Sequence, residues 1–566
     1  MVFLPPARLP QLPDLPDTVT VDKFINTESH GRRPFSSSRA PYTCGLTGAS
    51  HDASHVASRV DHLARAIGKR LGLSPNEGTA WDRVVCLYSL NTIDYIPLTH
   101  AIHRLSGVVT PASAAYSSQE LQHQLHSSGA KALFTCLPLL ENALPAAEGA
   151  GIPRDRIFLL PVPEVPNKGS FVTVDDLVAE GRHLPRVAPL HWTKGQGARQ
   201  PAYLCYSSGT SGLPKAVMIS HRNVIANVVQ ICTSDSVSRD ELGIATQTTL
   251  GVLPFSHIYG LVLVGLVGQY RGDQIVVLPK FDLTAVLAAV QRFRIEQLSV
   301  VPPILIQIIT NKHISAAYDL SSVRWVFSGA APLGAEVIDD LLKLYPAWRL
   351  GQGYGNLETD TLFGSSGSLI PGTIAKIIDA DGREVTELET RGELVVQSPS
   401  VVLGYLNNER ANAETFIWDE DGRWLRTGDE VLVRKSPQGH EHFVVTDRIK
   451  ELIKVKGHQV APAELEAHLL AHPFVSDCTV IPVQDDRAGE VPKAFIVKAK
   501  DASDKPDDHV AAAVCKHVED HKSRHKWLKG GVEFIDAVPK SPSGKILRRL
   551  LRDKEAQARK QKGPKL

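Results

Sequence analysis

A loop rich in glycine and hydroxyl side chains, set between two short apolar runs, limits most strongly what this chain can fold into. The runs Pro201-Ala-Tyr-Leu-Cys205 and Ala216-Val-Met-Ile219 each predict a short strand, and residues from 223 onward predict a helix. Between the strands lies Tyr206-Ser-Ser-Gly-Thr-Ser-Gly-Leu-Pro-Lys215. Glycine lets the backbone bring N–H groups against an anion, while hydroxyls add donors and a lysine adds charge.

The loop therefore predicts a phosphate-binding site, although it lacks the G-x-x-x-x-G-K-[ST] spacing of a Walker A loop. A flexible polar linker is the competing interpretation. A linker is not usually flanked by two apolar runs, nor does it usually end in a Pro-Lys pair, so we favour the phosphate site. This loop alone indicates a nucleoside triphosphate but no particular reaction.

Length and composition exclude several classes of protein. A chain of 566 residues exceeds what one hydrophobic core usually supports, so we expect at least two domains. A net charge of +1 argues against a strongly basic nucleic-acid surface. The seven scattered cysteines form no C-x-x-C pair, which predicts free thiols in a reducing compartment and no structural zinc site. We expect no signal peptide and no membrane span, because the apolar run 258–267 is too short.

The chain ends in a basic stretch followed by Gly563-Pro-Lys-Leu566. Pro-Lys-Leu nearly matches the peroxisomal address Ser-Lys-Leu. We therefore expect a cytoplasmic or a peroxisomal protein, and in the second case a peroxisomal import receptor as partner. A frayed terminus that no receptor binds is equally open.

Helices and short apolar strands alternate through most of the chain, after a first segment, 1–50, that we expect to be loosely structured. This alternation predicts an α/β domain with a largely parallel sheet. The expected helices span 55–73, 95–105, 117–128 and 283–293. The expected strands span 84–88, 107–111, 132–135, 275–278, 297–301 and 325–327.

Near residue 376 the pattern changes to alternating strands around the hairpin-type turn Asp381-Gly382. It predicts a smaller, antiparallel subdomain that runs to about residue 446. Beyond Asp447 we expect a compact α+β domain, so the predicted domains are 1–446 and 447–566, the latter with a basic tail. Its helices are expected at 463–470 and 510–521, and its strands at 479–483, 494–497 and 532–535.

Several further clusters bear chemically active side chains, and some of them follow predicted strands. In open α/β sheets ligands collect at such strand ends. The clusters are Pro254-Phe-Ser-His-Ile-Tyr-Gly260, Ser328-Gly-Ala-Ala-Pro-Leu333, Gly351-Gln-Gly-Tyr-Gly355, Arg426-Thr-Gly-Asp429 and Pro539-Lys-Ser-Pro-Ser-Gly-Lys545.

Taken in series, these motifs and the phosphate loop resemble the acyl-adenylate-forming (AMP-binding) enzyme superfamily, most closely the 4-coumarate–CoA-ligase-like acyl-CoA synthetases. The resemblance runs from about residue 55 to 549. It implies a large N-terminal domain of layered α/β sheets with a small antiparallel subdomain, and a smaller, mobile α+β C-terminal domain. It also implies an ATP-dependent acyl- or aryl-CoA ligase, with a role in secondary metabolism. A hydrophobic carboxylic acid becomes an acyl-AMP, and the thiol of coenzyme A then displaces AMP.

The resemblance also implies roles for particular residues. Lys545 and His257 would act at the acid carboxylate and Lys456 near the coenzyme A arm, while Asp447 would be the hinge of a rotation between the two steps. The acid pocket would include His257, Tyr259, Leu263, Ser328 and Gly351. Mg²⁺ would bind Glu358 and Thr210. ATP and coenzyme A would contact Ser207, Ser208, Gly209, Thr210, Ser211, Gly212, Lys215, Gly329, Ala330, Gln352, Gly353, Tyr354, Asp429, Arg448, Lys450, Lys454, Gly457 and Gln459.

Each of these residues taken alone has a plainer explanation. His257 could be structural, Tyr259 an ordinary core residue, Asp429 a turn residue bound to its own backbone, and Lys545 a loop lysine. The lysines at 450, 454 and 456 could form one solvated face. These explanations lose weight because the residues occur in series with the phosphate loop.

One departure from the family pattern lies at Tyr354-Gly-Asn-Leu-Glu358, where the family has Tyr-Gly-x-Thr-Glu. Leu357 replaces a threonine whose hydroxyl meets the α-phosphate, although Glu358 is in register for Mg²⁺. The next family segment, at 364–371, follows sooner than in relatives. Either the loop is naturally short, or residues that include the true Thr-Glu pair are missing and the Mg²⁺ carboxylate with them.

Three functions therefore remain open. The first is an active acyl- or aryl-CoA ligase. The second keeps the adenylation and loads a carrier-protein thiol or an amine, with that acceptor supplied in trans. The third is a nucleotide- or acyl-binding homologue without turnover, because of the shortened loop. The particular acid and the oligomeric state cannot be inferred from the sequence.

Overall fold

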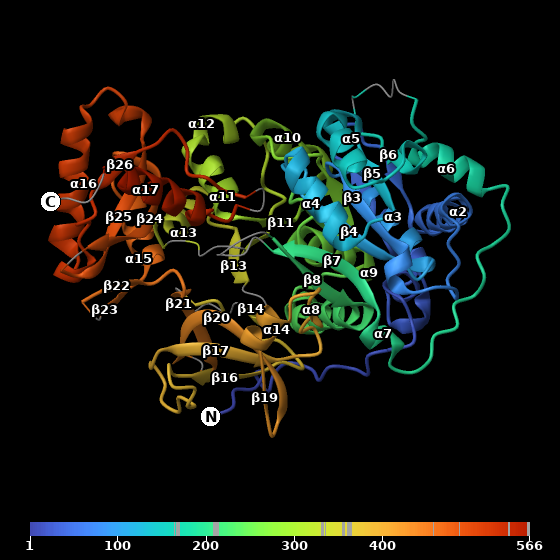
Figure 1. Cartoon of the computed structure of the whole chain (residues 1–566), viewed down its shortest axis with the longest axis horizontal. Helices are drawn as coiled ribbons and strands as arrows, with labels where there is room; N and C mark the ends of the chain where they lie inside the picture. The colour runs from blue at the N-terminus through green and yellow to red at the C-terminus, as the bar shows by residue number, and fades with distance from the viewer. Residues whose placement is uncertain are drawn as a thin grey trace.

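The computed structural model describes residues 1–562 except 164, 166–169, 208–213, 330–332, 334, 354–356, 359–364, 438, 457, 486 and 542–543. Of 335–336, 357–358 and 559–562 it describes the backbone only. Figure 1 shows a large body that contains the N-terminal part of the chain and, on the left, a smaller one that contains the C-terminus. Within the described ranges, no helix combines the length and the apolar character needed to cross a membrane.

The first large sheet has seven strands and is buried on both faces. Along β3 (Val84–Tyr88), Val85 and Leu87 join the largest core cluster, whereas Cys86 and Tyr88 join another on the opposite face. A doubly covered sheet needs nearly continuous apolar strands, which explains the uninterrupted runs in the sequence. The spatial order is β18 (Gly404–Tyr405), β8 (Lys215–Ser220), β7 (Pro201–Ser207), β4 (Val108–Ala112), β3, β5 (Ala132–Thr135) and β6 (Ile157–Leu159).

The second large sheet also has seven strands, and its central strands are parallel as the alternating pattern predicted. Neighbouring parallel strands end at the same edge, so their last residues lie side by side. The largest core cluster contains residues of both large sheets and therefore joins them. The order is β13 (Arg349–Gly353), β12 (Trp325–Gly329), β11 (Gln297–Val300), β9 (Thr248–Gly251), β10 (Gln274–Val277), β1 (Tyr42–Cys44) and β2 (Ser50–His51).

Helices of this body begin and end where the sequence offers caps. Helix α2 (Ala53–Leu71) starts after Asp52, whose side chain accepts a hydrogen bond from the His55 N–H, and it ends at the left-handed Gly72. The other α-helices are α1 (Val21–Ile25), α3 (Tyr95–Arg104), α4 (Ser118–Ser128), α5 (Leu140–Gly149), α6 (Val174–Gly181), α7 (Gln196–Arg199), α8 (His221–Glu241), α9 (Val267–Arg271), α10 (Leu283–Phe293), α11 (Pro302–Thr310), α12 (Lys312–Ser315) and α13 (Ala335–Leu344). Short 3-10 helices are η1 (Glu28–His30), η2 (Phe35–Ser37), η3 (Ala80–Arg83), η4 (Leu137–Leu139) and η5 (Arg154–Arg156).

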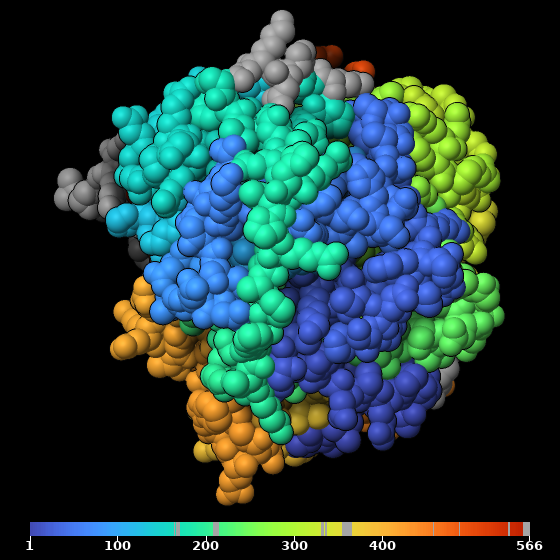
Figure 2. All heavy atoms as spheres, turned by 90° about the vertical axis from the view of Figure 1, so that its right-hand side faces the viewer, coloured from blue at the N-terminus to red at the C-terminus, as the bar shows by residue number. Residues whose placement is uncertain are grey.

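The N-terminal segment is ordered into the body, so the expectation of a loosely structured segment over 1–50 is wrong. Strand β1 pairs with β10 in the second sheet, and Tyr42 and Ile25 are fully buried. Phe3 makes two backbone hydrogen bonds with Ala375 of the antiparallel subdomain, at 2.8 and 3.1 Å. Figure 2 shows this segment in dark blue on one face, crossed by the extended teal chain between α6 and α7. Pairing with residues far along the chain therefore orders a segment whose own sequence shows no clear helix or strand pattern.

The antiparallel subdomain predicted from residue 376 is present as a five-stranded sheet. The predicted turn is also present, because Gly382 has a φ of +80° and its N–H donates to the Asp379 carbonyl over 3.1 Å. The strands are β16 (Ile374–Ile378), β17 (Gly392–Gln397), β20 (Gly422–Lys435) and β19 (Phe416–Asp419), with β21 (Glu441–Arg448) also paired to β20. Helix α14 (Glu409–Thr415) and the pair β14 (Leu357–Glu358) and β15 (Ser368–Leu369) complete this region.

The C-terminal part has a hydrophobic core of its own, formed by residues from Ile453 to Leu528. Its mixed sheet and helices agree with the α+β domain predicted beyond Asp447. The strands are β22 (Ile453–Val455), β23 (His458–Val460), β24 (Val475–Asp485), β25 (Gly489–Lys498) and β26 (Val532–Phe534). The helices are α15 (Pro462–Leu470), α16 (Asp507–His521) and α17 (Arg548–Lys562), with 3-10 turns η7 (Lys500–Ala502) and η8 (Arg524–Lys526).

Candidate active site

Strands β7 and β8 form an antiparallel pair that brings the two ends of the phosphate loop together. Ser207 and Lys215 are register partners at the open end of this pair. The Lys215 Nζ lies 5.5 Å from the centre of the Tyr405 ring, a distance at which a cation is attracted to an aromatic face. Ser208, Gly209, Thr210, Ser211 and Gly212 lie outside the described residues. The described part thus holds both ends of the loop at one edge of the first sheet.

The ends of β12 and β13 gather four of the predicted residues at one edge of the second sheet. Ser328 pairs with Gln352, and Gly329 pairs with Gly353. The Gln352 Oε1 accepts a hydrogen bond of 3.0 Å from the Leu333 N–H. Ala330 and Tyr354, predicted for the same site, lie outside the described residues.

Gly329 has no room for a side chain, and Ser328 bears a buried polar one. A Cβ placed on Gly329 would lie 2.9 Å from a ring carbon of Tyr259, so glycine lets the ring lie against the strand. The buried Ser328 hydroxyl has no hydrogen-bond partner in the part of the chain that the structure describes. Buried polar groups normally have a partner, so this hydroxyl is suited to a ligand at the strand end.

His257 and Tyr259 lie at the start of the π-helix η6 (Tyr259–Leu266), a rare element that often marks functional sites. The Tyr259 hydroxyl donates to the Phe327 carbonyl over 3.0 Å, which ties η6 to β12. The Tyr259 N–H donates to the His257 Nδ1 over 3.3 Å. Leu263, one turn further on, is partly buried. The residues predicted for the acid pocket therefore lie on three elements that meet at Phe327: η6 and the turn before it (His257, Tyr259 and Leu263), β12 (Ser328) and β13 (Gly351).

Lys545 comes to this place from the C-terminal domain. Its loop is closed by the Ser541 N–H, which donates to the Lys545 carbonyl over 2.7 Å, and by Gly544, whose φ of +81° suits glycine. A Cβ on Gly544 would lie 3.2 Å from Val301 Cγ2, so the loop touches the chain between β11 and α11. The positive charge of Lys545 also acts on His257. Burial lowers the pKa of His257 to about 4, and the charge of Lys545 is the second cause of this shift.

The surroundings of Lys545 lower its pKa. Burial lowers the pKa of Lys545 to about 8, and the positive charge of Arg448 acts in the same direction. The carboxylates of Glu451 and Asp429 oppose this shift. The structure therefore brings Lys545, His257, Asp429 and Arg448 within electrostatic reach of one another.

Asp429 and Arg448 are register partners on β20 and β21, and their side chains form an ion pair of 3.5 Å. The turn before Asp429 is fixed by Glu393, which accepts hydrogen bonds from the Gly428 N–H and from the Arg426 guanidinium. Asp429 is buried, whereas Arg448 is partly exposed. A buried carboxylate at a rigid turn is suited to accept hydrogen bonds from ligand hydroxyls.

The residues predicted for coenzyme A are not gathered with Lys545. Lys454, Lys456 and Gln459 are exposed on the hairpin of β22 and β23, at the lower left of Figure 1, and Gly457 lies outside the described residues. Lys456 adopts the left-handed conformation, with a φ of +49°, at the tip of this hairpin. Lys450 is also exposed, but it lies before this hairpin, between β21 and β22. Its charge and that of Lys215 both act on Glu414, whose pKa is lowered first by a hydrogen bond from Arg410.

Glu358, the predicted Mg²⁺ ligand, lies in β14, where it pairs with Ser368 of β15. The backbone at Glu358 and at Ser368, on either side of the short connection that departs from the family pattern, therefore forms a two-stranded pair. The side chains of Leu357 and Glu358 and the hydroxyl of Thr210 lie outside what the structure describes. Both metal-ligand assignments remain predictions.

Sequence reasoning missed a buried charge cluster beside the proposed hinge. The Arg548 Nη1 lies 2.6 Å from a carboxylate oxygen of Glu451, and its Nη2 lies 2.5 Å from one of Glu466. Burial raises the pKa of Asp447, the proposed hinge residue, to about 6, and Arg548 partly offsets this. In the sequence Arg548 stands in a basic helix, and its partners are far away along the chain, so no local signal identified the cluster.

Comparison with known proteins assigns the family. The AMP-binding enzyme family matches residues 46–406, and the AMP-binding enzyme C-terminal domain matches residues 464–545. The chain belongs to the AMP-binding enzyme family.

Its relatives include the acyl-CoA ligase easD of Emericella nidulans, 38% identical over 98% of this chain and 100% of that protein. Another is the acyl-CoA ligase AKT1 of Alternaria alternata, 39% identical over 98% of this chain and 97% of that protein. These relatives support AMP-forming acyl-CoA ligase as the class of activity.

The fold has close counterparts among solved structures. The anthranilate CoA ligase AuaEII, in complex with anthranoyl-AMP, superposes with a TM-score of 0.79 at 21% identity, covering 96% of this chain and 99% of that one. ATP-bound MatB of Rhodopseudomonas palustris gives a TM-score of 0.76 at 21% identity, covering 95% of this chain and 99% of that one. At these identities the likeness establishes the fold: a large N-terminal and a smaller C-terminal domain of an adenylate-forming enzyme.

Proposed function

We propose that this protein activates a hydrophobic carboxylic acid with ATP and transfers the acyl group to coenzyme A through the residues described above. One observation carries the proposal: Lys545 of the C-terminal domain lies against the N-terminal domain, with His257, Asp429 and Arg448 in electrostatic reach. Such convergence of a cation, an imidazole and a buried carboxylate from two domains suits the reaction of one anion with another.

In the first step, an oxygen of the acid carboxylate attacks the α-phosphorus of ATP, and pyrophosphate leaves to give an acyl-AMP. The Lys545 ammonium would hold the carboxylate and the α-phosphate together and so reduce their repulsion. The phosphate loop from Ser207 to Lys215 would hold the β- and γ-phosphates. The chemistry of the loop supports this role, because its hydroxyls and Lys215 are donors suited to phosphate.

The nucleoside would lie between two features of the site. Asp429 would accept hydrogen bonds from the ribose hydroxyls, with Arg448 beside it. Gln352, Gly353 and Tyr354 would line the adenine, and Gly329 and Ala330 would pass along it. The rigid turn at Gly428 and the parallel register of β12 and β13 support this assignment.

Mg²⁺ is the metal that this chemistry requires. Thr210 and Glu358 offer a hydroxyl and a carboxylate oxygen, which are the donor types that Mg²⁺ prefers. We propose that these residues hold it, where it would neutralise phosphate charge. Replacing Glu358 with glutamine should raise the Mg²⁺ concentration needed for half-maximal pyrophosphate release; an unchanged requirement would remove Glu358 from this role.

In the second step, the thiol of coenzyme A attacks the acyl carbon and AMP leaves. We propose that the domain boundary lies between residues 446 and 447 and that the C-terminal domain first rotates about Asp447. The rotation would bring Lys456, Gly457, Lys454 and Gln459 to the site. The exposure of the hairpin that bears Lys456, while Lys545 occupies the site, supports two alternating arrangements.

The acid would lie beside Tyr259, Leu263, Ser328 and Gly351. A panel of aromatic and aliphatic acids, with ATP, Mg²⁺ and coenzyme A, tests the proposal by pyrophosphate release and by mass detection of the acyl-CoA. Formation of an acyl-CoA from at least one acid is expected. Pyrophosphate release at background across the panel would contradict it. Release without acyl-CoA, followed by loading of a carrier protein or an amine, would assign the other acceptor.

The C-terminal Pro-Lys-Leu lies outside the described residues, and we propose it as a peroxisomal signal read by an import receptor. A fluorescent protein that ends in residues 552–566 should enter peroxisomes, and deletion of the last three residues should leave it in the cytosol. The same distribution for both fusions would contradict this location.

A further inference from the structure

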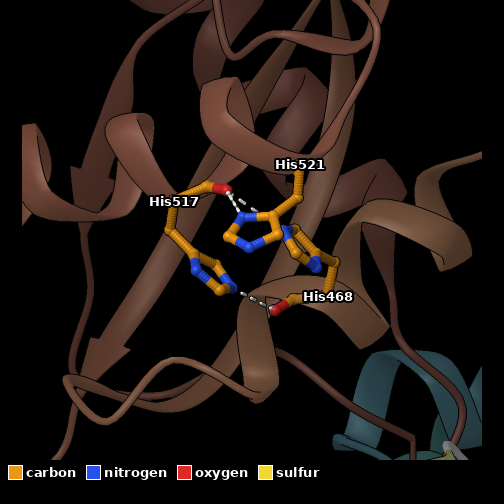
Figure 3. Close-up of side chains that lie close together, drawn as sticks. All are labelled: His468, His517 and His521. Carbon is orange, nitrogen blue, oxygen red and sulfur yellow. Dashed lines mark hydrogen bonds between the residues drawn. The ribbon is translucent and has the colours of Figure 1, made fainter.

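Three histidines come together in the C-terminal domain where α15 and α16 pack (Figure 3). His468 is on α15, and His517 and His521 lie one turn apart on α16. One ring nitrogen from each residue lies within 4.8 Å of those of the other two. The rings of His468 and His517 stack with centroids 4.1 Å apart and planes within 6°.

This histidine cluster (His468, His517 and His521) contains none of the residues proposed for ATP, acid or coenzyme A. Figure 1 shows α16 at the edge of the C-terminal domain that faces away from the N-terminal body. His521 is exposed, and His468 and His517 are partly buried, so an ion in solution can reach them.

The rings are held by backbone carbonyls. The His468 Nε2 and the His517 Nε2 each lie 3.2 Å from the carbonyl of the other residue, and the His521 Nδ1 lies 2.8 Å from the His517 carbonyl. A carbonyl only accepts hydrogen bonds, so each of these nitrogens carries the proton and the second nitrogen of each ring has a free lone pair. Metal-binding histidines are commonly oriented by such bonds.

The neighbouring groups leave the cluster accessible to a cation. The nearby Lys522 ammonium is paired with Glu464 over 3.1 Å. The His472 ring lies 5.2 Å from that of His517, but its Nδ1 accepts a hydrogen bond of 3.2 Å from the Phe474 N–H. Three imidazoles are therefore available, whereas the lone pair of the His472 Nδ1 is engaged by Phe474.

We propose that His468, His517 and His521 bind one divalent transition-metal ion, such as Zn²⁺, with water in the fourth position. Imidazole nitrogens suit Zn²⁺, Ni²⁺ and Cu²⁺, and zinc with three histidines and one water is four-coordinate. Two stacked rings do not aim at one point, so one of them turns on binding, gives up its carbonyl hydrogen bond and presents its unprotonated nitrogen to the metal. The ion would link α15 to α16 and stiffen the domain that bears Lys545.

The test uses full-length protein treated with EDTA and then titrated with Zn²⁺ against a chromogenic chelator. We expect one Zn²⁺ per chain at the cluster and a rise in Tm on binding, because a ligand of the folded state stabilises it. The variants His521→Gln and His468→Gln should each weaken binding by about tenfold or more and lose the Tm rise. The matched control is His525→Gln: this histidine stacks on His458 in the same domain, outside the cluster, and its loss should change neither readout.

The Co²⁺ form separates this site from the free cysteines of the chain. Ligation by imidazole gives visible d–d bands without the near-ultraviolet band of thiolate ligation. Absence of stoichiometric Zn²⁺ binding would overturn the proposal, as would unchanged binding by both cluster variants or a thiolate band in the Co²⁺ spectrum. These readouts do not depend on turnover, so their failure is distinct from failure of the proposed ligase function.

Discussion

Arg448 and Asp429 face each other across β21 and β20, with the Arg448 Nε 3.5 Å from the Asp429 Oδ1. The residue before Arg448 is Asp447, the proposed hinge. Strand β21 is the last strand before the separate C-terminal core. The proposed ribose contact on β20 and the proposed hinge on β21 are therefore neighbours on two paired strands, so nucleotide binding and domain movement are expected to influence each other.

Replacement of Asp429 with asparagine tests the ribose contact. The amide keeps the size of the side chain but loses the charge that strengthens hydrogen bonds from hydroxyls, so we expect the KM for ATP to rise about tenfold. Steady-state pyrophosphate release measures it. Glu420→Gln removes an exposed carboxylate from the same subdomain and should leave the KM unchanged. An unchanged KM in Asp429→Asn would remove Asp429 from the ATP site.

Arg548→Met tests the buried charge cluster. Glu451 and Glu466 are both buried, and Glu466 also accepts hydrogen bonds of 2.8 Å from the Thr479 hydroxyl and the Val480 N–H. Removal of the guanidinium leaves two buried carboxylates without their cation, which costs about 3–5 kcal/mol in the free energy of unfolding. Urea denaturation followed by fluorescence measures this loss.

The control for Arg548→Met is Arg434→Met, which breaks the exposed pair with Glu389. Exposed ion pairs contribute at most about 1 kcal/mol, so this variant should unfold close to the wild type. Equal stability of the two variants would show that the buried cluster does not hold the C-terminal domain together.

Asp447 gives stability a specific pH dependence. Burial raises its pKa to about 6 from an ordinary value of 3.8, so between these values the folded protein binds more protons than the unfolded chain. Its contribution is full below about pH 4 and is lost as the pH rises through 6. The unfolding free energy of Asp447→Asn, relative to wild type, should therefore increase between pH 4 and 7. A difference in unfolding free energy that stays constant over this range would contradict a buried Asp447 with a raised pKa.

The lowered pKa of Lys545 predicts an alkaline limb in the pH profile, that is, a fall of the adenylation rate at alkaline pH. Its pKa is lowered to about 8, so the ammonium is present below this pH and is lost above it. The kcat/KM for pyrophosphate release should fall above about pH 8, because this ratio follows groups of the free enzyme. Lys545→Arg keeps its charge at all these values and should be slower but lack this limb. A limb at the same pH in both proteins would assign it to another group.

The strands and helices with strong apolar patterns could be predicted from the sequence. The run 84–88 is β3, and the expected helix 283–293 is α10. Elements that depend on distant partners could not be predicted. Tyr42 is in a strand because it pairs with Ile275, and nothing in its local sequence records that pairing.

The candidate site was predictable only in part. The strand end at Ser328 follows from the apolar run 325–327 and the rule that ligands collect there, whereas Gln352 was marked only by a glycine-rich segment. The roles of Asp429 and Lys456 came from the family resemblance alone. The Arg548 cluster was missed because its carboxylates come from α15 and from the segment after the hinge. The histidine cluster was missed because two helices must pack before its i,i+4 spacing has a partner.

The most direct test separates the two half-reactions in Lys545→Ala and Lys456→Ala. Acyl-AMP formation is followed by pyrophosphate release, and the second step by conversion of supplied acyl-AMP and coenzyme A to acyl-CoA. Lys545→Ala should lose the first step by about 100-fold or more and keep the second, and Lys456→Ala should do the reverse. Equal loss of both steps in each variant, or an unchanged first step in Lys545→Ala, would contradict the account.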